Sequence, residues 1–176
     1  MEWAIGSENN EDEFVISPTG SMVGIDGGAG GFDTLILSEG HYDSIEYRAI
    51  DANSGTIIRD GGALSFLGLE PILQVATVND FTVNLLPTSA PFLSGTATLD
   101  AGSLVGSAFD IVVDGANLER YELNAPINSL TVKSSTALID PVITLDINSW
   151  SNAFTGDLIV ETENINVEAV VSIGSD

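Results

Sequence analysis

Two aspartates, Asp26 and Asp33, flank a glycine-rich segment and could supply oxygen ligands to a hard cation. Calcium prefers carboxylate and backbone carbonyl oxygens in a flexible arrangement, and glycines let a backbone fold tightly with positive φ. We therefore name Asp26, Gly28, Gly30 and Asp33 as a candidate calcium site, and Ca²⁺ is the one cofactor that the sequence suggests. A glycine-rich turn between two strands, without a metal, is the alternative interpretation of the same residues.

The charge balance favours an exterior location. Four basic residues stand against 26 acidic ones, which gives a formal net charge of -22. Such a chain repels a phosphate backbone, so we expect no nucleic-acid partner. Its carboxylates must be solvated, screened by salt or neutralised by divalent cations, which favours an extracellular or cell-surface setting. A merely solubilising acidic surface remains the alternative, and so does simple solvation for the cluster at Glu8, Glu11, Asp12 and Glu13.

Catalytic chemistry has few candidates in this chain. Cysteine is absent and His41 is the only histidine, so a nucleophilic triad would have to be built around that residue. Acid pairs suited to glycoside hydrolysis always exist among 26 carboxylates, and a glycoside-active enzyme is the alternative from another functional class. We name no catalytic or cofactor-binding residue and expect no enzyme activity. Trp3 and Trp150 are either sugar-stacking platforms or, as we favour, core residues.

The elements that would position these residues are strands. Apolar residues recur at every second position in short runs bounded by turn residues, which is the pattern of strands with one buried face. Helical periodicity is missing, except that Ser38 to Ala49 could hold a helical turn. The clearest alternating runs are Phe81 to Leu85, Tyr121 to Leu123, Leu130 to Val132 and Ile143 to Ile147; further strands are expected at Glu13 to Ser17, Ser21 to Ile25, Thr34 to Leu37, Thr56 to Arg59, Gly95 to Leu99, Asp110 to Val113, Asp157 to Glu161 and Ile165 to Ile173.

Several of these strands end in an aspartate or asparagine. The positions are Asp26, Asn84, Asp100, Asp114, Asn124 and Asp146. Asx side chains cap turning backbone, and a recurring strand-then-Asx unit suits the corners of a parallel β-helix, or β-solenoid. A two-sheet β-sandwich uses the same alternation and is the alternative. We predict one all-β domain over residues 1–176, with 44% apolar residues and no segment that inserts into a membrane.

The glycine tract resembles a repeat of secreted toxins. Gly27-Gly28-Ala29-Gly30-Gly31-Phe32-Asp33 is similar to the G-G-x-G-x-D nonapeptide of repeats-in-toxin proteins, with the acid one residue late. In that family the glycine and aspartate turns bind calcium, so the resemblance implies the same ligand here.

Three further regions resemble repeats of very long bacterial surface proteins, adhesin-like or filamentous-haemagglutinin-like, of planctomycetes and marine bacteria. They are Gly6 to Phe14 followed by Asp26 to Leu37, then Gly62 to Ile72, and finally Ser129 to Lys133 with Val142 to Asp146 and Phe154 to Val160. The resemblance implies a structural or adhesive segment of a longer secreted protein, folded as a β-helix and without catalytic activity. Its partners would be neighbouring segments of the parent protein and a carbohydrate or protein ligand at the cell surface.

Overall fold

The computed structural model describes residues 2–51, 53–85, 96–101, 110–115, 118–134, 142–145, 155–162 and 164–167. Within these ranges the chain is all-β, with two sheets and no helix, as the alternating pattern predicted. The strands are β1 (Trp3–Ile5), β2 (Glu13–Ile16), β3 (Gly24–Asp26), β4 (Thr34–Leu37), β5 (His41–Asp51), β6 (Ser54–Arg59), β7 (Gly62–Leu67), β8 (Ile72–Gln74), β9 (Thr77–Leu85), β10 (Thr96–Ala101), β11 (Asp110–Gly115), β12 (Leu118–Asn124), β13 (Ser129–Ser134), β14 (Val142–Leu145), β15 (Asp157–Glu161) and β16 (Asn164–Val167). Within these residues no helix is long and apolar enough to cross a membrane.

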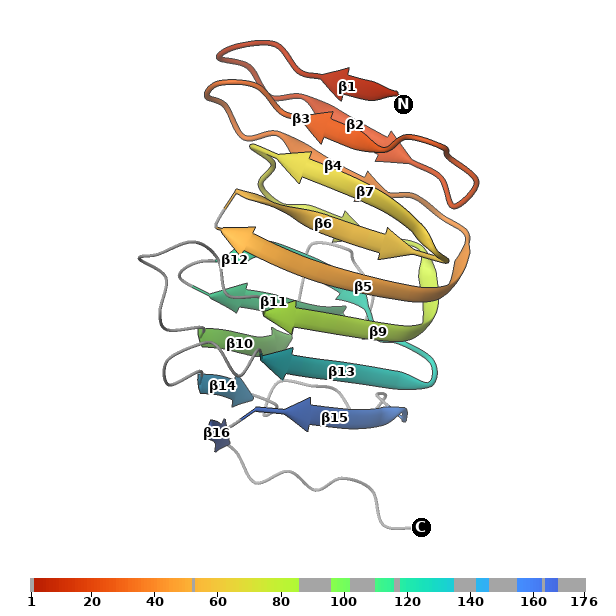
Figure 1. Ribbon diagram of the computed structural model, residues 1–176, viewed down its shortest axis with the longest axis vertical. Coiled ribbons are helices and arrows are strands. Elements are labelled where there is room, and N and C mark those ends of the chain that lie inside the picture. Colours follow the sequence, from red (N-terminus) through yellow and green to blue (C-terminus); the bar gives the residue numbers. More distant parts are fainter. Residues whose placement is uncertain are drawn as a thin grey trace.

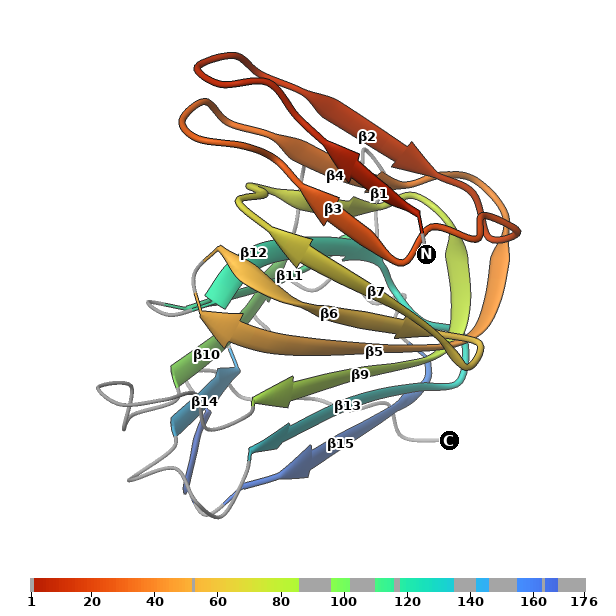
Figure 2. The ribbon, with the colours of Figure 1, turned by 45° about the horizontal axis from the view of Figure 1, so that its top comes forward.

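The two sheets lie face to face (Figures 1 and 2), and each has eight strands among the described residues. Sheet A has the order β1-β3-β7-β6-β5-β9-β13-β15, and sheet B has the order β2-β4-β8-β12-β11-β10-β14-β16. Successive strands of the chain mostly alternate between the sheets, so most neighbouring strands within a sheet are parallel. Residues far apart in the sequence therefore stack in layers from one end of the molecule to the other.

Two antiparallel excursions interrupt this alternation. Strands β5, β6 and β7 follow one another within sheet A, and strands β10, β11 and β12 do so within sheet B. In the first excursion β5 lies three strand positions beyond β3, and the chain then returns through β6 so that β7 pairs with β3. Asp60 and Gly61 join β6 to β7 with φ of 46° and 84°, the left-handed pair that a tight two-residue hairpin turn needs.

The space between the sheets is filled by the inward-facing side chains of the strands. Tyr47, Phe81 and Tyr121 meet in its middle, where the Tyr47 and Tyr121 rings lie 5.0 Å apart and the Phe81 and Tyr121 rings 5.1 Å apart. Leu130 and Val132 are fully buried in the same core, as the alternation predicted. Their neighbours on the last strand of sheet A, Leu158 and Val160, pack against it while half-buried.

The helical turn proposed for Ser38 to Ala49 is wrong, because His41–Asp51 is an extended strand. Ile45 and Ala49 are four residues apart, and this spacing also fits a strand in which Tyr47 between them faces inward. The Asx positions, by contrast, mark strand ends well. Strand β3 ends at Asp26 and strand β12 at Asn124, while β9, β10 and β11 end one residue after Asn84, Asp100 and Asp114.

Candidate functional site

The candidate calcium residues lie in a loop that is stacked between two others. A rung here means one strand of sheet A, its following loop and the next strand of sheet B. Rung 1 is β1 to β2, rung 2 is β3 to β4 and rung 3 is β7 to β8. The loops of these rungs, residues 6–12, 27–33 and 68–71, form what we call the loop stack.

Rungs 1 and 2 are successive copies of one 21-residue unit. Trp3 pairs with Gly24 and Glu13 pairs with Thr34, and each pair differs by 21 in residue number. The two loops are therefore the same length and lie one on the other, with Gly6 N donating to Asp26 O over 2.7 Å and Asn9 N donating to Ala29 O over 3.0 Å. The shorter third loop joins them through Gly27 N to Leu67 O at 2.8 Å and Glu70 N to Asp33 O at 2.6 Å.

Asp33 is buried, with only 3% of its surface exposed, and it ties rung 2 to rung 1. Its Oδ1 accepts a hydrogen bond of 2.8 Å from the backbone N–H of Asp12. Asp12, the equivalent residue of rung 1, accepts one bond from Ser7 N at 2.7 Å on Oδ2 and another from Asn10 Nδ2 at 2.9 Å on Oδ1. These two carboxylates therefore hold the loop backbone in place.

Asp26 ends β3 and caps the turn that follows it. Its Oδ1 accepts a hydrogen bond of 3.0 Å from the backbone N–H of Gly28, the local bond expected of a strand-ending Asx residue. Gly28 and Gly30 have φ of 100° and 78°, so both need the freedom of glycine. Asn9, which is 21 residues before Gly30, shares this conformation with φ of 61°.

Two other glycines are required by the closeness of the loops. A Cβ atom at Gly6 would overlap the carbonyl oxygen of Gly27, and a Cβ atom at Gly27 would overlap that of Gly68. Gly6 and Gly27 thus form a column in which each backbone lies directly against the next. The sequence carried a signal for this column in the repeated spacing of Gly6, Asp12 and Phe14 at Gly27, Asp33 and Leu35.

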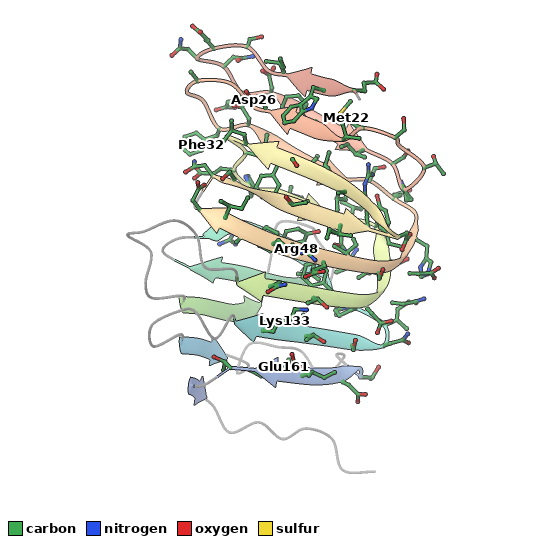
Figure 3. The ribbon with its side chains drawn as sticks, in the orientation of Figure 1. Met22, Asp26, Phe32, Arg48, Lys133 and Glu161 are labelled. Carbon is green, nitrogen blue, oxygen red and sulfur yellow. The ribbon has the colours of Figure 1, made fainter. Side chains whose placement is uncertain are left out.

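The predicted metal ligands Asp26, Gly28, Gly30 and Asp33 thus belong to one loop, and both carboxylates bind backbone N–H groups. Among the described residues, no group of three or more His, Asp or Glu side chains is placed to hold a metal ion. A carboxylate has about four lone-pair sites, so these hydrogen bonds leave oxygen sites unused. Calcium binding at this loop stays a prediction. Phe32, at the position where the toxin repeat has its acid, is 67% exposed (Figure 3).

A polar cluster on the outer face of sheet A gathers two of the four basic residues. We call Glu46, Arg48, Asn84 and Lys133 the Glu46 cluster. Arg48 Nη2 lies 3.0 Å from Glu46 Oε2, Asn84 Nδ2 donates to Glu46 Oε1 over 2.6 Å, and Lys133 Nζ lies 3.8 Å from the same oxygen. Arg48, Lys133 and Glu161 follow one another down this face in Figure 3. The hydrogen bond from Arg48 is the largest cause that lowers the pKa of Glu46, and the bond from Asn84 and the charge of Lys133 act in the same direction.

His41 lies at the surface, at the start of β5. Its Nδ1 is 3.1 Å from Thr77 Oγ1, and its Nε2 is 3.6 Å from Asp43 Oδ1. This resembles a triad in composition, but the Thr77 hydroxyl donates to the carbonyl oxygen of Gly40 at 3.0 Å. The hydroxyl proton therefore points away from His41, and the group is not arranged to generate a nucleophile. The Asp43 side chain is also 87% exposed, and a carboxylate so accessible to solvent does not hold an imidazole in one orientation.

Arg59 has a structural role that the sequence did not reveal. It is buried, and its guanidinium donates to three backbone carbonyl oxygens, those of Ser17 at 3.1 Å, Gly20 at 3.0 Å and Met22 at 3.3 Å. These carbonyls belong to the segment between β2 and β3, so Arg59 holds rung 1 to rung 2 from the side opposite the loop stack. Such carbonyl fixation needs the planar, multiply donating guanidinium of arginine.

Trp3 is not the core residue that we favoured. Its side chain is 52% exposed, and its indole lies over Gly24, where a Cβ atom would overlap the ring. Trp150, the Asp146 turn and Phe154, which starts the last stretch of the third resemblance motif, lie outside the described residues. No protein-family model, curated protein or solved structure matches the chain.

Proposed function

We propose that this chain is a β-solenoid segment that serves as a structural or adhesion module of a secreted or cell-surface bacterial protein, without catalytic activity. The observation that carries the proposal is the loop stack with its 21-residue register, in which Trp3 pairs with Gly24 and Glu13 with Thr34. Regular stacking of this kind builds length, since each rung contacts only the rungs beside it.

The nature of the polar residues supports a scaffold over an enzyme. The buried carboxylate Asp33 bonds to the backbone of the next rung, and the buried Arg59 bonds to backbone carbonyls. Both side chains therefore have a structural role in joining the rungs. The acidic surface, with a net charge of -22, suits a saline or calcium-rich exterior, where cations screen the repulsion between carboxylates.

The proposal is tested on the purified chain with neutral and acidic polysaccharides. We expect no release of reducing ends or unsaturated products from any of them. Surface labelling of intact source cells with an antibody against the chain should be positive. Turnover that is lost when one acid is changed to its amide, in a variant that still folds, would contradict the proposal and favour the glycoside-active enzyme.

A second candidate is carbohydrate binding on the outer face of sheet A, as the aromatic ring of Trp3 is half exposed and supported from below by Gly24. A flat, fixed aromatic face suits stacking against a sugar ring. The cross-strand row that starts at Trp3 and Gly24 continues through Ser65, Thr56 and Arg48, which offer hydrogen bonds. Trp3→Ala should abolish glycan binding, and Phe32→Ala, which removes an aromatic ring that is 67% exposed in a loop, should not.

A further inference from the structure

The end of the molecule formed by β1 and β2 is an unfinished surface. Among the described strands, β1 ends the order of sheet A and β2 ends that of sheet B, so each has a partner on one side only. The open backbone groups of two strands therefore face the same direction. Open edges of this kind are templates for a further strand.

The core is also unfinished at this end. Ala4 and Phe14 face inward but are only partly buried, whereas their partners one rung below, Ile25 and Leu35, are fully buried. Met22, on the segment after β2, is likewise only partly buried. A layer laid on β1 and β2 would remove these apolar surfaces from water, which is favourable in proportion to the area buried.

The hydrogen bonds of the loop stack end in the same unfinished way. In rung 2, Asp33 Oδ1 accepts from the backbone N–H of Asp12 in the rung above. In rung 1 the equivalent atom, Asp12 Oδ1, accepts instead from the side chain of Asn10 in its own loop. The carbonyl oxygen of Gly27 lies against the α-carbon of Gly6, while the carbonyl of Gly6 has no such rung above it in the described residues.

We propose that the β1 and β2 edge binds one further rung of the same 21-residue type. Its loop carries a glycine over Gly6 and, six residues later, an aspartate whose backbone N–H donates to Asp12 Oδ1. Its two strands pair in parallel with β1 and β2, about 4.8 Å away. This deepens the proposed scaffold function by naming the partner that the scaffold accepts and the register in which it does so.

The opposite end of a second copy fits this surface less well. Among the described strands, that end is formed by β15 and β16, which are two residues apart in the sequence, whereas β1 and β2 are seven residues apart. A two-residue connection cannot cover a seven-residue loop or supply its glycine and aspartate. Both surfaces are also acidic, with Glu8, Glu11 and Glu13 on one and Asp157 and Glu161 on the other, so the charges oppose end-to-end association.

The test is a longer chain in which a copy of residues 3–23 is inserted between Glu2 and Trp3, with Trp3→Gly made in the copy to leave the surface over the original Trp3 open. The matched control carries, in addition, Gly6→Ala in the copy alone. That Cβ atom would meet the carbonyl of the original Gly6, as a Cβ at Gly6 meets Gly27 O. Both chains and the parent are compared by amide hydrogen exchange and thermal unfolding.

We expect the insertion to slow exchange of the original β1 and β2 amides by about tenfold, since edge strands fray more readily than paired ones. It should also raise Tm, and the Gly6→Ala control should lose both gains. Unchanged exchange at β1 and β2 in the inserted chain would overturn the proposal. So would concentration-dependent protection of the same amides in the parent chain, because the occupant would then be a second copy. Neither result bears on catalysis or location, so the proposed function is tested separately.

Discussion

The Oδ1 atom of Asp33 accepts a hydrogen bond of 2.8 Å from the backbone N–H of Asp12, which lies 21 residues earlier in the chain and one rung away. The two rungs are not paired as strands in this loop region, so the carboxylate supplies a hydrogen bond between them. It fixes the distance between two loops whose backbones are in direct contact at their glycines. The stability of the loop stack should therefore depend on this one side chain.

Asp33→Ala should lower the free energy of unfolding by about 1–3 kcal/mol, because it leaves the Asp12 N–H without its acceptor in a part-buried site. Asp33→Asn keeps one side-chain oxygen and should cost less. Urea denaturation measures both, and Asp43→Ala is the control because Asp43 is 87% exposed. Equal stability of Asp33→Ala and Asp43→Ala would show that the bond contributes nothing.

Gly27→Ala should lower the free energy of unfolding by about 1–3 kcal/mol through overpacking. The added methyl group would collide with the carbonyl oxygen of Gly68, a backbone atom that cannot rotate away. Gly62→Ala is the matched control, because its nearest neighbour would be Arg59 O at 3.4 Å, an ordinary contact. Thermal unfolding of both variants is the measurement, and a Gly27→Ala chain as stable as Gly62→Ala would contradict the close stacking.

The sequence predicted what is encoded locally. Alternation predicted most of the described strands, though not β1, β5, β7 or β8, and the Asx positions Asp26 and Asn124 fell at strand ends because those side chains stabilise turning backbone nearby. The tight turn at Asp60-Gly61 follows the strand that the sequence predicts for Thr56 to Arg59. Its consequence, a strand pair that runs back toward β3, was not foreseen, since a hairpin signal does not say which sheet receives the returning strand.

The candidate site was located by its residue types, but the partners of those residues are set by register. Asp33 was identified as an oxygen donor, while its bond to Asp12 depends on a pairing over 21 residues. The residue types predict a glycine-rich turn around Gly27, yet the contact that requires glycine comes from Gly68 in another rung. Arg59 has no local signal at all, because the carbonyls that it binds are about forty residues away in sequence and become neighbours only through β7 and β3.

Glu46→Gln should flatten the acid side of the stability profile. The folded-state pKa of Glu46 is lowered, first by the hydrogen bond from Arg48, so its contribution is present above the ordinary value of 4.5 and is lost as pH falls through the folded-state pKa. The variant should be less stable than the parent at neutral pH and equal to it at the acid end. Unfolding by urea between pH 2 and pH 7 measures this, and Glu39→Gln, at an exposed position, should leave the profile unchanged.

Tyr121 and Gln74 should behave as a coupled pair. The Tyr121 hydroxyl donates to Gln74 Oε1 over 2.7 Å, and both residues are fully buried. Tyr121→Phe leaves the glutamine oxygen without this donor and should cost about 1–3 kcal/mol. The double change with Gln74→Met removes both partners and should cost less than the sum of the single changes. Additive costs in this double-mutant cycle would show that the two side chains do not interact.

Burial raises the pKa of Tyr121 well above its ordinary value of 10.0. A group whose pKa is raised in the folded state contributes its full stabilisation at pH values below its unfolded-state pKa. This stabilisation is lost as the pH rises through the folded-state pKa. The parent should therefore lose stability above about pH 10 more steeply than Tyr121→Phe does. Alkaline unfolding followed by near-UV circular dichroism measures the difference, and parallel profiles for the two chains would contradict the burial of an ionisable hydroxyl.

Calcium should stabilise the protein if the loop of Asp26 and Asp33 binds it. A site at a ligand concentration of about a hundred times its dissociation constant adds about 2.7 kcal/mol, which raises Tm by several degrees in a chain of this size. The comparison is Tm in millimolar CaCl₂ against Tm in EDTA, measured within each variant. Asp33→Ala should shrink this gap, whereas Asp43→Ala, at a carboxylate that is 87% exposed, should leave it unchanged.

NaCl at matched ionic strength is the decisive control, because screening of a net charge of -22 also raises stability. If NaCl reproduces the whole gain, the effect is screening and the carboxylates of the loop stack serve the backbone alone.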